Sequence, residues 1–454
     1  MIFRRRYGSR RFALVTAVAV ASASLVLAAC GGPAGTADNG QGGGQGSQEA
    51  VDAALQAGGT ITYWTWTDAK KQVEAFQKKY PNVKVKLVNA GTGDEHYTKL
   101  QNTIKAGSGA PDVAQIEFFA LPQFGLPGHL VDLRQYGFEA FGPDYAQSSW
   151  AISHVGESLV GLPQGPGPMA LFYNKKVFDK YGIAVPKTWD EYLAAARKLH
   201  QADPTKYITA DVGDAGFATS MIWQAGGRPF TVDGKKITVN LADEGTLKWT
   251  SVWNQLLSEG LLQPSAHWTD EWFKGLVDGS IATLPFGNWM GGVIDGLGPK
   301  VKDLWRVAPM PTYDGGKPVS AEHGGSAQAV LKQSQNPALA AAFLRWLNHE
   351  DGNDLYIEAG GYPSSLEETR DPAFLDKAYA AFGDQKINRL FDVTSDTVGE
   401  GWQFLPYQTY ANSIFGDTVG QSYKNKSDLN AGLKAWQDAL VDYGKRQGFE
   451  IDGG

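Results

Sequence analysis

The chain has 454 residues, of which 43% are hydrophobic and 20% are charged. This composition is globular, and the length suits two or three domains of ordinary size. The formal net charge is −7, and because the first thirty residues hold five arginines and no acid, the rest of the chain carries −12. Such an acidic body is poorly suited to binding nucleic acid or an anionic membrane surface.

The first thirty residues have the pattern of an export signal, predicted to span residues 1–29. A basic segment, Arg4–Arg11, precedes an apolar run at 13–27, and two alanines then stand before Cys30, the single cysteine of the chain. Leu27-Ala-Ala-Cys30 resembles the bacterial lipobox, which implies cleavage before Cys30, lipid on its thiol and anchoring to the outer face of the cell membrane. A plain secretory signal or a signal anchor is the alternative, and Sec and twin-arginine export both fit.

Residues 30–58 are predicted to form a flexible linker behind the lipid. Their glycines, glutamines and serines, followed by a short alanine-rich stretch, bury too little apolar area to offset the entropy of ordering the chain. No later segment reaches the roughly 18 consecutive apolar residues of a membrane-spanning helix, so the lipid is the only membrane attachment that we expect.

From residue 60 onward, strand-like and helix-like segments alternate. Runs rich in β-branched or aromatic residues at 60–66, 83–88 and 112–117 are separated by two amphipathic helical patterns, the second of which is expected to stop at Gly107. This alternation predicts a parallel sheet with right-handed crossovers. A further strand is expected at 170–174. Further helices are expected after the capping box Thr188…Glu191, after Asn336-Pro337, and along residues 429–443.

Ligands of open parallel sheets bind outside the carboxyl ends of the strands. Three polar and aromatic clusters follow predicted strands in this chain, at residues 66–68, 117–119 and 286–289. These clusters are therefore candidate binding loops.

The 14 tryptophans divide into two kinds by their surroundings. Trp346 and Trp436 lie on the apolar stripes of helical patterns, which predicts core positions. Because a sugar offers an apolar C–H face and a ring of hydroxyls, aromatic rings beside amides and carboxylates indicate a carbohydrate site. For each ring a core position is an equal alternative. The tryptophans in such polar, glycine-containing segments are Trp64, Trp66, Trp223, Trp289 and Trp402.

Familiar catalytic and cofactor motifs are absent from the sequence. It has no P-loop, no dinucleotide-binding glycine pattern after a strand, no HExxH and no GxSxG, and no two of its seven histidines fall within five residues of each other. We therefore expect a protein that is not an enzyme and that has no cofactor and no metal. A secreted glycosidase stays open as an alternative, since Asp68 and Glu117 could form a carboxylate pair. A binding protein for a cationic small molecule is the other alternative.

Several segments, in order along essentially the whole mature chain, resemble the family 1 extracellular solute-binding proteins, the maltose-binding-protein-like receptors of ABC importers. The resemblance implies an α/β, two-lobe periplasmic-binding-protein-like fold of type II, each lobe a mostly parallel sheet flanked by helices, with a hinge crossed more than once. The implied N-terminal lobe comprises residues 59–167 and 315–372, and the C-terminal lobe 168–314 and 373–454. The matching segments are 60–68, 161–175, 186–191, 223–227, 279–289 and 323–326.

The resemblance also implies a function. A monomeric receptor would capture a di- or oligosaccharide in the cleft between its lobes and deliver it to ABC transporter permease subunits. Trp289 matches a family tryptophan that stacks on a sugar ring, and it is expected on the cleft floor with nothing bulky beside it. The residues expected at the ligand are Trp66, Asp68, Glu117, Gln164, Trp223, Trp289, Gly325, Tyr362 and Trp402.

Overall fold

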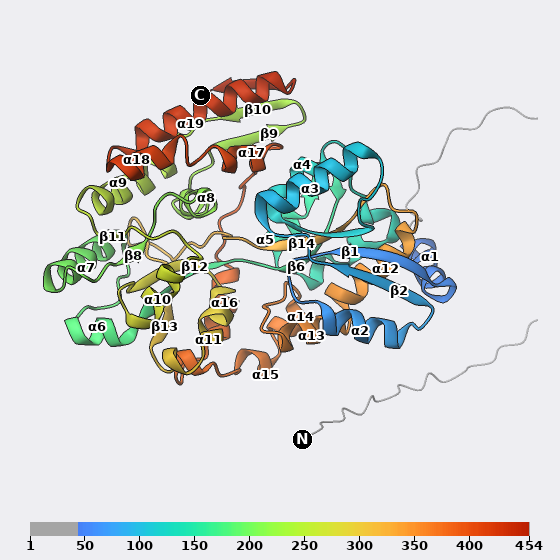
Figure 1. The fold of residues 1–454 in the computed structure, drawn as a ribbon, viewed down its shortest axis with the longest axis horizontal. Helices are drawn as coiled ribbons and strands as arrows, with labels where there is room; N and C mark the ends of the chain where they lie inside the picture. Colours follow the sequence, from blue (N-terminus) through green and yellow to red (C-terminus); the bar gives the residue numbers. More distant parts are fainter. Residues whose placement is uncertain (1–43, 454) are drawn as a thin grey trace, which may run out of the picture. The chain divides into compact units, whose positions relative to one another are not determined.

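Two groups of elements, each with its own sheets and core, build residues 44–453, the part of the chain that the computed structural model describes (Figure 1). We call them the first lobe, drawn mainly in blue and cyan, and the second lobe, drawn mainly in green and yellow. The predicted signal peptide and Cys30 lie outside the described residues. Every helix within residues 44–453 is too short or too polar to cross a bilayer.

The first lobe is organised around a five-stranded sheet in the order β2-β1-β3-β14-β6. As predicted, β1 pairs in parallel with both β2 and β3. Strand β14 pairs antiparallel with β3 and with β6, which the local sequence pattern did not reveal. The strands are β1 Gly59–Trp64, β2 Val83–Val88, β3 Val113–Glu117, β6 Leu162–Gly165 and β14 Ser326–Val330.

Helices α2 (Lys70–Lys79), α3 (Gly93–Ala106) and α12 (Pro337–His349) belong to the first lobe. Phe76 of α2 packs against the rings of Phe343 and Trp346 on α12, with centroids 4.8 and 5.2 Å away. Helix α3 ends at Gly107 in the left-handed region, at φ +67°, where a residue without a Cβ is favoured. The predicted helix stop at Gly107, the helix start at Pro337 and the core position of Trp346 are thus confirmed.

The second lobe contains a three-stranded sheet in the order β12-β7-β13, formed by β7 (Met169–Asn174), β12 (Thr283–Gly287) and β13 (Trp305–Ala308). Its strands pair antiparallel, which differs from the mostly parallel sheet expected for this lobe. Strand β7 follows directly from the first lobe, and its partners β12 and β13 come more than 100 residues later in the chain. Because no strand–helix–strand unit connects β7 to a neighbouring strand, parallel pairing is not required. Parallel pairing in this lobe joins the short strands β8 (Thr209–Ala210) and β11 (Leu262–Gln263), and it joins β10 (Lys236–Val239) to β15 (Glu450–Gly453).

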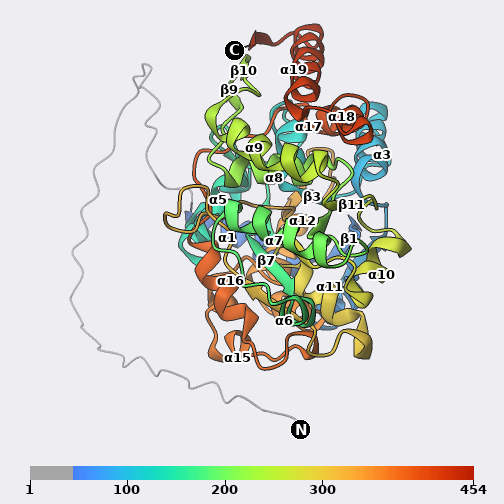
Figure 2. The same cartoon turned by 90° about the vertical axis from the view of Figure 1, so that its left-hand side faces the viewer.

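The core of the second lobe is rich in tryptophan, and Trp436 is fully buried in it, as predicted. Helix α7 (Trp189–Ala202) begins at the predicted cap, where Thr188 Oγ1 accepts a hydrogen bond from Glu191 N at 3.1 Å. Helix α19 (Leu429–Arg446) and the sheet of β9 (Phe230–Asp233), β10 and β15 lie at one end of this lobe, and α6 (Lys175–Tyr181) lies at the opposite end (Figures 1 and 2).

The remaining elements are mostly short connections. The helices are α4 Leu121–Gly125, α5 Gln147–Ile152, α8 Ala215–Gln224, α9 Glu244–Ser258, α10 Asp270–Asp278, α11 Met290–Gly296, α13 Gly352–Glu358, α14 Leu366–Thr369, α15 Pro372–Leu375, α16 Ile387–Ser395, α17 Gln408–Ser413 and α18 Val419–Asn425. The 3-10 turns are η1 Phe118–Ala120, η2 Leu133–Tyr136, η3 Phe138–Asp144, η4 Gly298–Val301 and η5 Ala380–Phe382. The strands are β4 His154–Val155, β5 Ser158–Leu159, β9 Phe230–Asp233, β10 Lys236–Val239 and β15 Glu450–Gly453.

Within the described residues, the chain passes between the lobes three times. Residues 166–168 join β6 to β7, and residues 309–325 join β13 to β14. The third passage follows α13, which packs on α2 and α12, and leads to α16, which packs on β7 and β13. The expected α/β fold with a hinge crossed more than once is therefore confirmed.

Helix α1 (Gly44–Ala57) corrects the predicted linker, which was expected to be flexible from residue 30 to residue 58. Val51, Ala54 and Leu55 have helical spacing and form an apolar stripe that packs against α12. On the same helix, Asp52 forms an ion pair with Arg345 of α12 at 2.6 Å. The linker prediction rested on the overall composition of residues 30–58, in which three apolar residues at helical spacing carry little weight.

Because Val51 is fully buried, Val51→Asp should place an unpaired carboxylate in the first-lobe core. We expect this change to lower the free energy of unfolding by roughly 3 kcal/mol or more. The matched control is Ala50→Asp, because Ala50 is exposed on the same helix and should tolerate the same side chain. Urea unfolding of both variants measures the difference, and equal midpoints would show that α1 is not docked in solution.

Candidate ligand-binding site

A buried amide and hydroxyl network holds the ends of the first-lobe strands together. Gln115 Nε2 on β3 donates to Gln164 Oε1 on β6 at 2.9 Å and to Ser326 Oγ on β14 at 3.0 Å. Gln115 Oε1 accepts from the hydroxyls of Thr65 and Thr67, which follow β1. Gln164, expected at the ligand, thus uses its amide oxygen inside the sheet, and its place at the ligand stays a prediction.

The loops after β1 and β3 bring three of the expected ligand residues to one edge of the sheet. Trp66 is half-buried and meets the ring of His96 edge-on, with centroids 5.4 Å apart. Glu117 Oε2 accepts a hydrogen bond from the Tyr97 hydroxyl at 3.1 Å. Asp68 is exposed and accepts from Lys70 N at 3.2 Å, beside the start of α2. These loops carry carboxylates and an indole, which suits hydroxylated ligands.

His96 links these loops to the strand beneath them. Its Nε2 lies 3.0 Å from the carbonyl oxygen of Gln115, and its ring is buried. Burial lowers the pKa of His96, so the ring is neutral at neutral pH. The imidazole therefore acts as an uncharged support for Trp66.

Trp289 lies directly beyond β12, at the start of α11, and its surroundings correct one expectation. Its Nε1 donates to the carbonyl oxygen of His323 at 2.7 Å, and its indole stacks on Trp268 with centroids 5.7 Å apart and planes 23° apart. The loop was expected to leave nothing bulky beside it. A Cβ on Gly324 would lie 3.1 Å from Trp289 Nε1, so the crossing segment approaches the indole closely.

Trp268 is the residue that the sequence analysis missed. It is 53% exposed, the only tryptophan among the described residues with such exposure, and its backbone has φ +69°. Non-glycine residues seldom adopt this left-handed conformation, and strained residues cluster at functional sites. A sequence signal existed, because residues 267–270 form a polar and aromatic cluster after β11, but that two-residue strand escaped detection.

Trp223 and Trp402 lie on a different surface. Their rings stack 5.1 Å apart at 5°, and Trp223 Nε1 donates to the Gly399 carbonyl oxygen at 2.6 Å. Both line a cavity of about 920 Å³ between the lobes, opposite Phe118 and Ile152 of the first lobe. Trp66, Asp68 and Trp289 are not among the residues that line this cavity, so the cavity holds only part of the predicted site.

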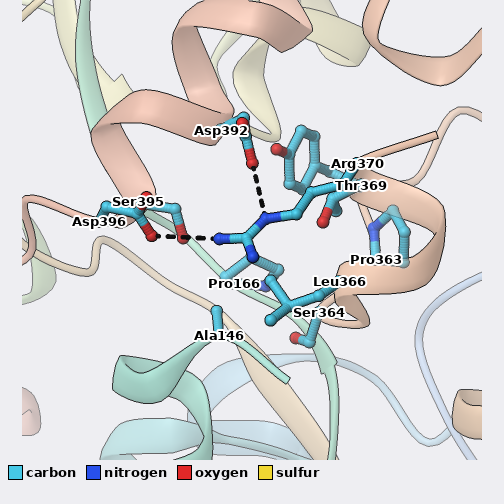
Figure 3. A pocket seen from close by; sticks show the side chains of 11 residues that line it. Ala146, Pro166, Pro363, Ser364, Leu366, Thr369, Arg370, Asp392, Ser395 and Asp396 are labelled. Atoms are coloured by element: carbon cyan, nitrogen blue, oxygen red, sulfur yellow. Dashed lines mark ion pairs between the residues drawn. The ribbon is translucent and has the colours of Figure 1, made fainter. Parts of the chain in front are cut away.

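Tyr362 and Gly325 lie in the crossing segments. Tyr362 is buried against Phe374 and Phe391 and lines a pocket of only about 10 Å³, which has room for about one water molecule. In Figure 3, Arg370 reaches across this pocket toward two carboxylates on α16 and its C-terminal cap, Asp392 and Asp396, each 3.6 Å away. A Cβ on Gly325 would lie 2.6 Å from the ring of Phe118, so sterics alone require glycine there.

Comparisons with known proteins place this architecture in a family. A model of the bacterial extracellular solute-binding protein family matches residues 63–354. The chain belongs to this family. The resemblance read from the sequence is therefore confirmed, and the protein is a member of a family of binding proteins that work outside the cytoplasm.

Individual solute-binding proteins are similar over most of the chain. One is the ABC transporter associated binding protein from B. animalis subsp. lactis, solved in complex with beta-1,6-galactobiose. It is 41% identical, covers 87% of this chain and 99% of its own, and has a TM-score of 0.79. Another is the galacto-N-biose-/lacto-N-biose I-binding protein from Bifidobacterium longum with lacto-N-biose, at 27% identity, the same coverage of both chains and TM-score 0.77. An arabinooligosaccharide-binding protein of Bacillus subtilis is 29% identical over 64% of this chain and 70% of its own.

One buried acid joins the crossing segments of this solute-binding protein. Glu322 Oε1 accepts from Ser148 Oγ on α5 at 2.7 Å, and its other oxygen accepts from Gly167 N. A Cβ on Gly167 would lie 2.3 Å from the His323 carbonyl oxygen, which explains the small residue between the two prolines at 166 and 168. Burial raises the pKa of Glu322 to about 7 from its ordinary 4.5, although both hydrogen bonds act in the opposite direction.

Because the folded state holds the Glu322 proton more tightly than the unfolded chain, the stability linked to this group is present below pH 4.5 and is lost as pH rises through about 7. We expect Glu322→Gln, whose amide can accept from Gly167 N and donate to Ser148, to abolish this loss. The unfolding free energy of the native protein, relative to the variant, should fall by about 3 kcal/mol between pH 4.5 and pH 8. Urea unfolding across this range measures it, with the exposed Glu157→Gln as control. A constant difference between native and Glu322→Gln proteins would contradict the prediction.

Proposed function

We propose that this protein is a non-catalytic receptor that captures a neutral di- or oligosaccharide between its lobes and delivers it to the permease subunits of an ABC importer. The observation that carries the proposal is the stacked pair of the exposed Trp268 and the half-buried Trp289, beyond the carboxyl end of β12. Support comes from the relatives, since two similar solved structures hold disaccharides and belong to ABC transporters.

The chemistry of the loops fits such a ligand. Indole faces of Trp66, Trp268 and Trp289 offer plates for the apolar faces of sugar rings. Asp68 and Glu117 offer acceptors for hydroxyl groups, and the acidic body disfavours anions. We expect dissociation constants in the micromolar range or below, or about −8 kcal/mol or better.

A second candidate ligand, an organic cation, is favoured by the composition of the 920 Å³ cavity. Its walls carry the Trp223–Trp402 pair and the acids Asp396 and Glu400, and among the described residues that line it none is a lysine or arginine. Aromatic faces beside carboxylates attract cations. Calorimetry that compares neutral saccharides with cationic amines decides between the two ligands, because only the right class should release heat at micromolar concentration.

A glycosidase is the enzyme alternative. It needs two carboxylates at a fixed separation on either side of the bond to be cleaved. Incubation of the protein with the saccharides that it binds should return them intact, and the release of shorter products would contradict a pure binding role.

We predict that Trp268→Ala and Trp289→Ala each weaken saccharide binding by about 2 kcal/mol, because each removes an aromatic plate. Trp268→Ala should leave the unfolding midpoint almost unchanged, since the ring is half exposed and alanine has the same Cβ at this left-handed φ as tryptophan has. The matched control is Trp436→Ala, which empties a fully buried core position and should lower stability by roughly 3–5 kcal/mol while the folded protein keeps its affinity.

Calorimetry and thermal unfolding on the same samples separate these effects. If Trp268→Ala retained native affinity for every saccharide that the protein binds, the pair would not be the binding platform. Loss of stability without loss of affinity in Trp289→Ala would instead assign Trp289 to packing.

We further propose that the mature protein begins at Cys30, carries lipid there and is a monomer on the outer face of the cell membrane. The support is the position of the single cysteine directly after Leu27-Ala28-Ala29. Cys30→Ser should release the protein from the membrane fraction without changing saccharide affinity, since the described body begins more than ten residues later. Mass spectrometry of the membrane fraction checks this, and an unmodified Cys30 in the mature protein would contradict it.

A further inference from the structure

A second cavity between the lobes, of about 570 Å³, lies at the edge where α3 and α4 meet α17 and α19. It shares no lining residue with the 920 Å³ cavity, and neither Trp268 nor Trp289 lines it. Among the described residues that line it none carries a charge, although 20% of the chain is charged. A ligand held here would therefore be neutral.

The lining contains a buried hydrogen-bond donor that has nothing to bind. Gln123 on α4 is only 9% exposed, and its Nε2 has no hydrogen-bond partner among the described residues. Its Oε1 is used, because it accepts from Thr409 Oγ1 on α17 across the two lobes. This atom is enclosed by the protein, so an acceptor in the cavity reaches it only when the Gln123 amide turns toward the cavity. The hydrogen bond formed then recovers the roughly 1–3 kcal/mol that a buried, unpaired donor costs.

Aromatic rings and further amides complete the wall. Tyr410 on α17 stacks on Tyr443 of α19, with centroids 3.6 Å apart and planes 12° apart, and Tyr443 also meets Tyr407 at 5.4 Å. Gln101 and Gln447 add uncharged donors and acceptors from opposite lobes. Phenol rings beside amides match a ligand that has apolar C–H faces and many hydroxyls.

We propose that this cavity is a second binding site for a neutral saccharide, which accepts the hydrogen bond of Gln123 Nε2 and packs against the Tyr410–Tyr443 pair. Its volume falls within the range of about 300–1,000 Å³ usual for small-molecule sites and suits one or two sugar rings. The choice of ligand class rests on the proposed function. The site is formed by residues of both lobes. Its ligand should therefore favour the conformation of the protein in which Gln123 of the first lobe contacts Thr409 of the second.

The test uses the full mature chain, β-1,6-galactobiose as the probe, calorimetry for the tight site and saturation-transfer NMR for a weaker one. Gln123→Met keeps the size of the side chain but removes the unpaired donor, and it should weaken the second site roughly tenfold. The matched control, Thr409→Val, removes the same inter-lobe hydrogen bond and leaves Gln123 Nε2 in place, so it should keep the second site. Ser413→Trp, at an exposed position on α17, should fill the cavity and abolish the second site without disturbing folding.

The outcomes separate this inference from the proposed function. Weak binding that survives Trp289→Ala, falls in Gln123→Met and disappears in Ser413→Trp supports a second site. A single site that Trp289→Ala removes entirely would overturn the second site and leave the proposed function standing. Equal losses in Gln123→Met and Thr409→Val would also overturn it, since the effect would then come from the contact between the lobes. No binding of any saccharide by the native protein would overturn both.

Discussion

The antiparallel insertion of β14 between β3 and β6 is the constraint on which the site depends. The chain leaves the first lobe after β6, builds most of the second lobe and returns through residues 309–325 to place β14 between β3 and β6. The segment 309–325, which we call the return segment, is therefore held at one end by β13 of the second lobe and at the other end by β14 of the first. The Gln115 amide then joins β3, β6 and β14 from inside, so the loops after β1 and β3 start from a rigid edge.

The return segment also determines which side chains are possible around it. His323 offers its carbonyl oxygen to Trp289, while the neighbouring glycines touch Trp289 on one side and Phe118 on the other. An aromatic residue from each lobe is thus held against one stretch of backbone. A Cβ on Gly325 would collide with Phe118, and one on Gly324 would be crowded by Trp289. Both residues also have left-handed φ values, +77° at Gly324 and +87° at Gly325, so backbone geometry and close approach explain why glycine stands at both positions.

The region between the lobes also contains buried polar side chains that have no partner of opposite charge. Glu322 is held by a hydroxyl and a backbone amide and has no cationic partner among the described residues, which is why its proton is retained to near neutral pH. Gln123 is likewise buried with half of its amide unused. Glu322 and Gln123 both lie where the lobes meet, and a polar group that folding leaves incompletely paired is one that a bound solute can satisfy.

Elements with local signals could be predicted from the amino-acid sequence alone. Periodicity, turn chemistry and capping predict the strands at 60–64 and 83–88, the Gly107 stop, the Thr188 cap and the core tryptophans Trp346 and Trp436. The other features depend on contacts between segments that are distant along the chain. Helix α1 was hidden because its apolar stripe is short and gains stability only by docking on α12, and the direction of β7 was hidden because its partners are distant in sequence. The exposure of Trp268 and its stacking on Trp289 depend on two loops that approach each other in space, and no local pattern encodes that meeting.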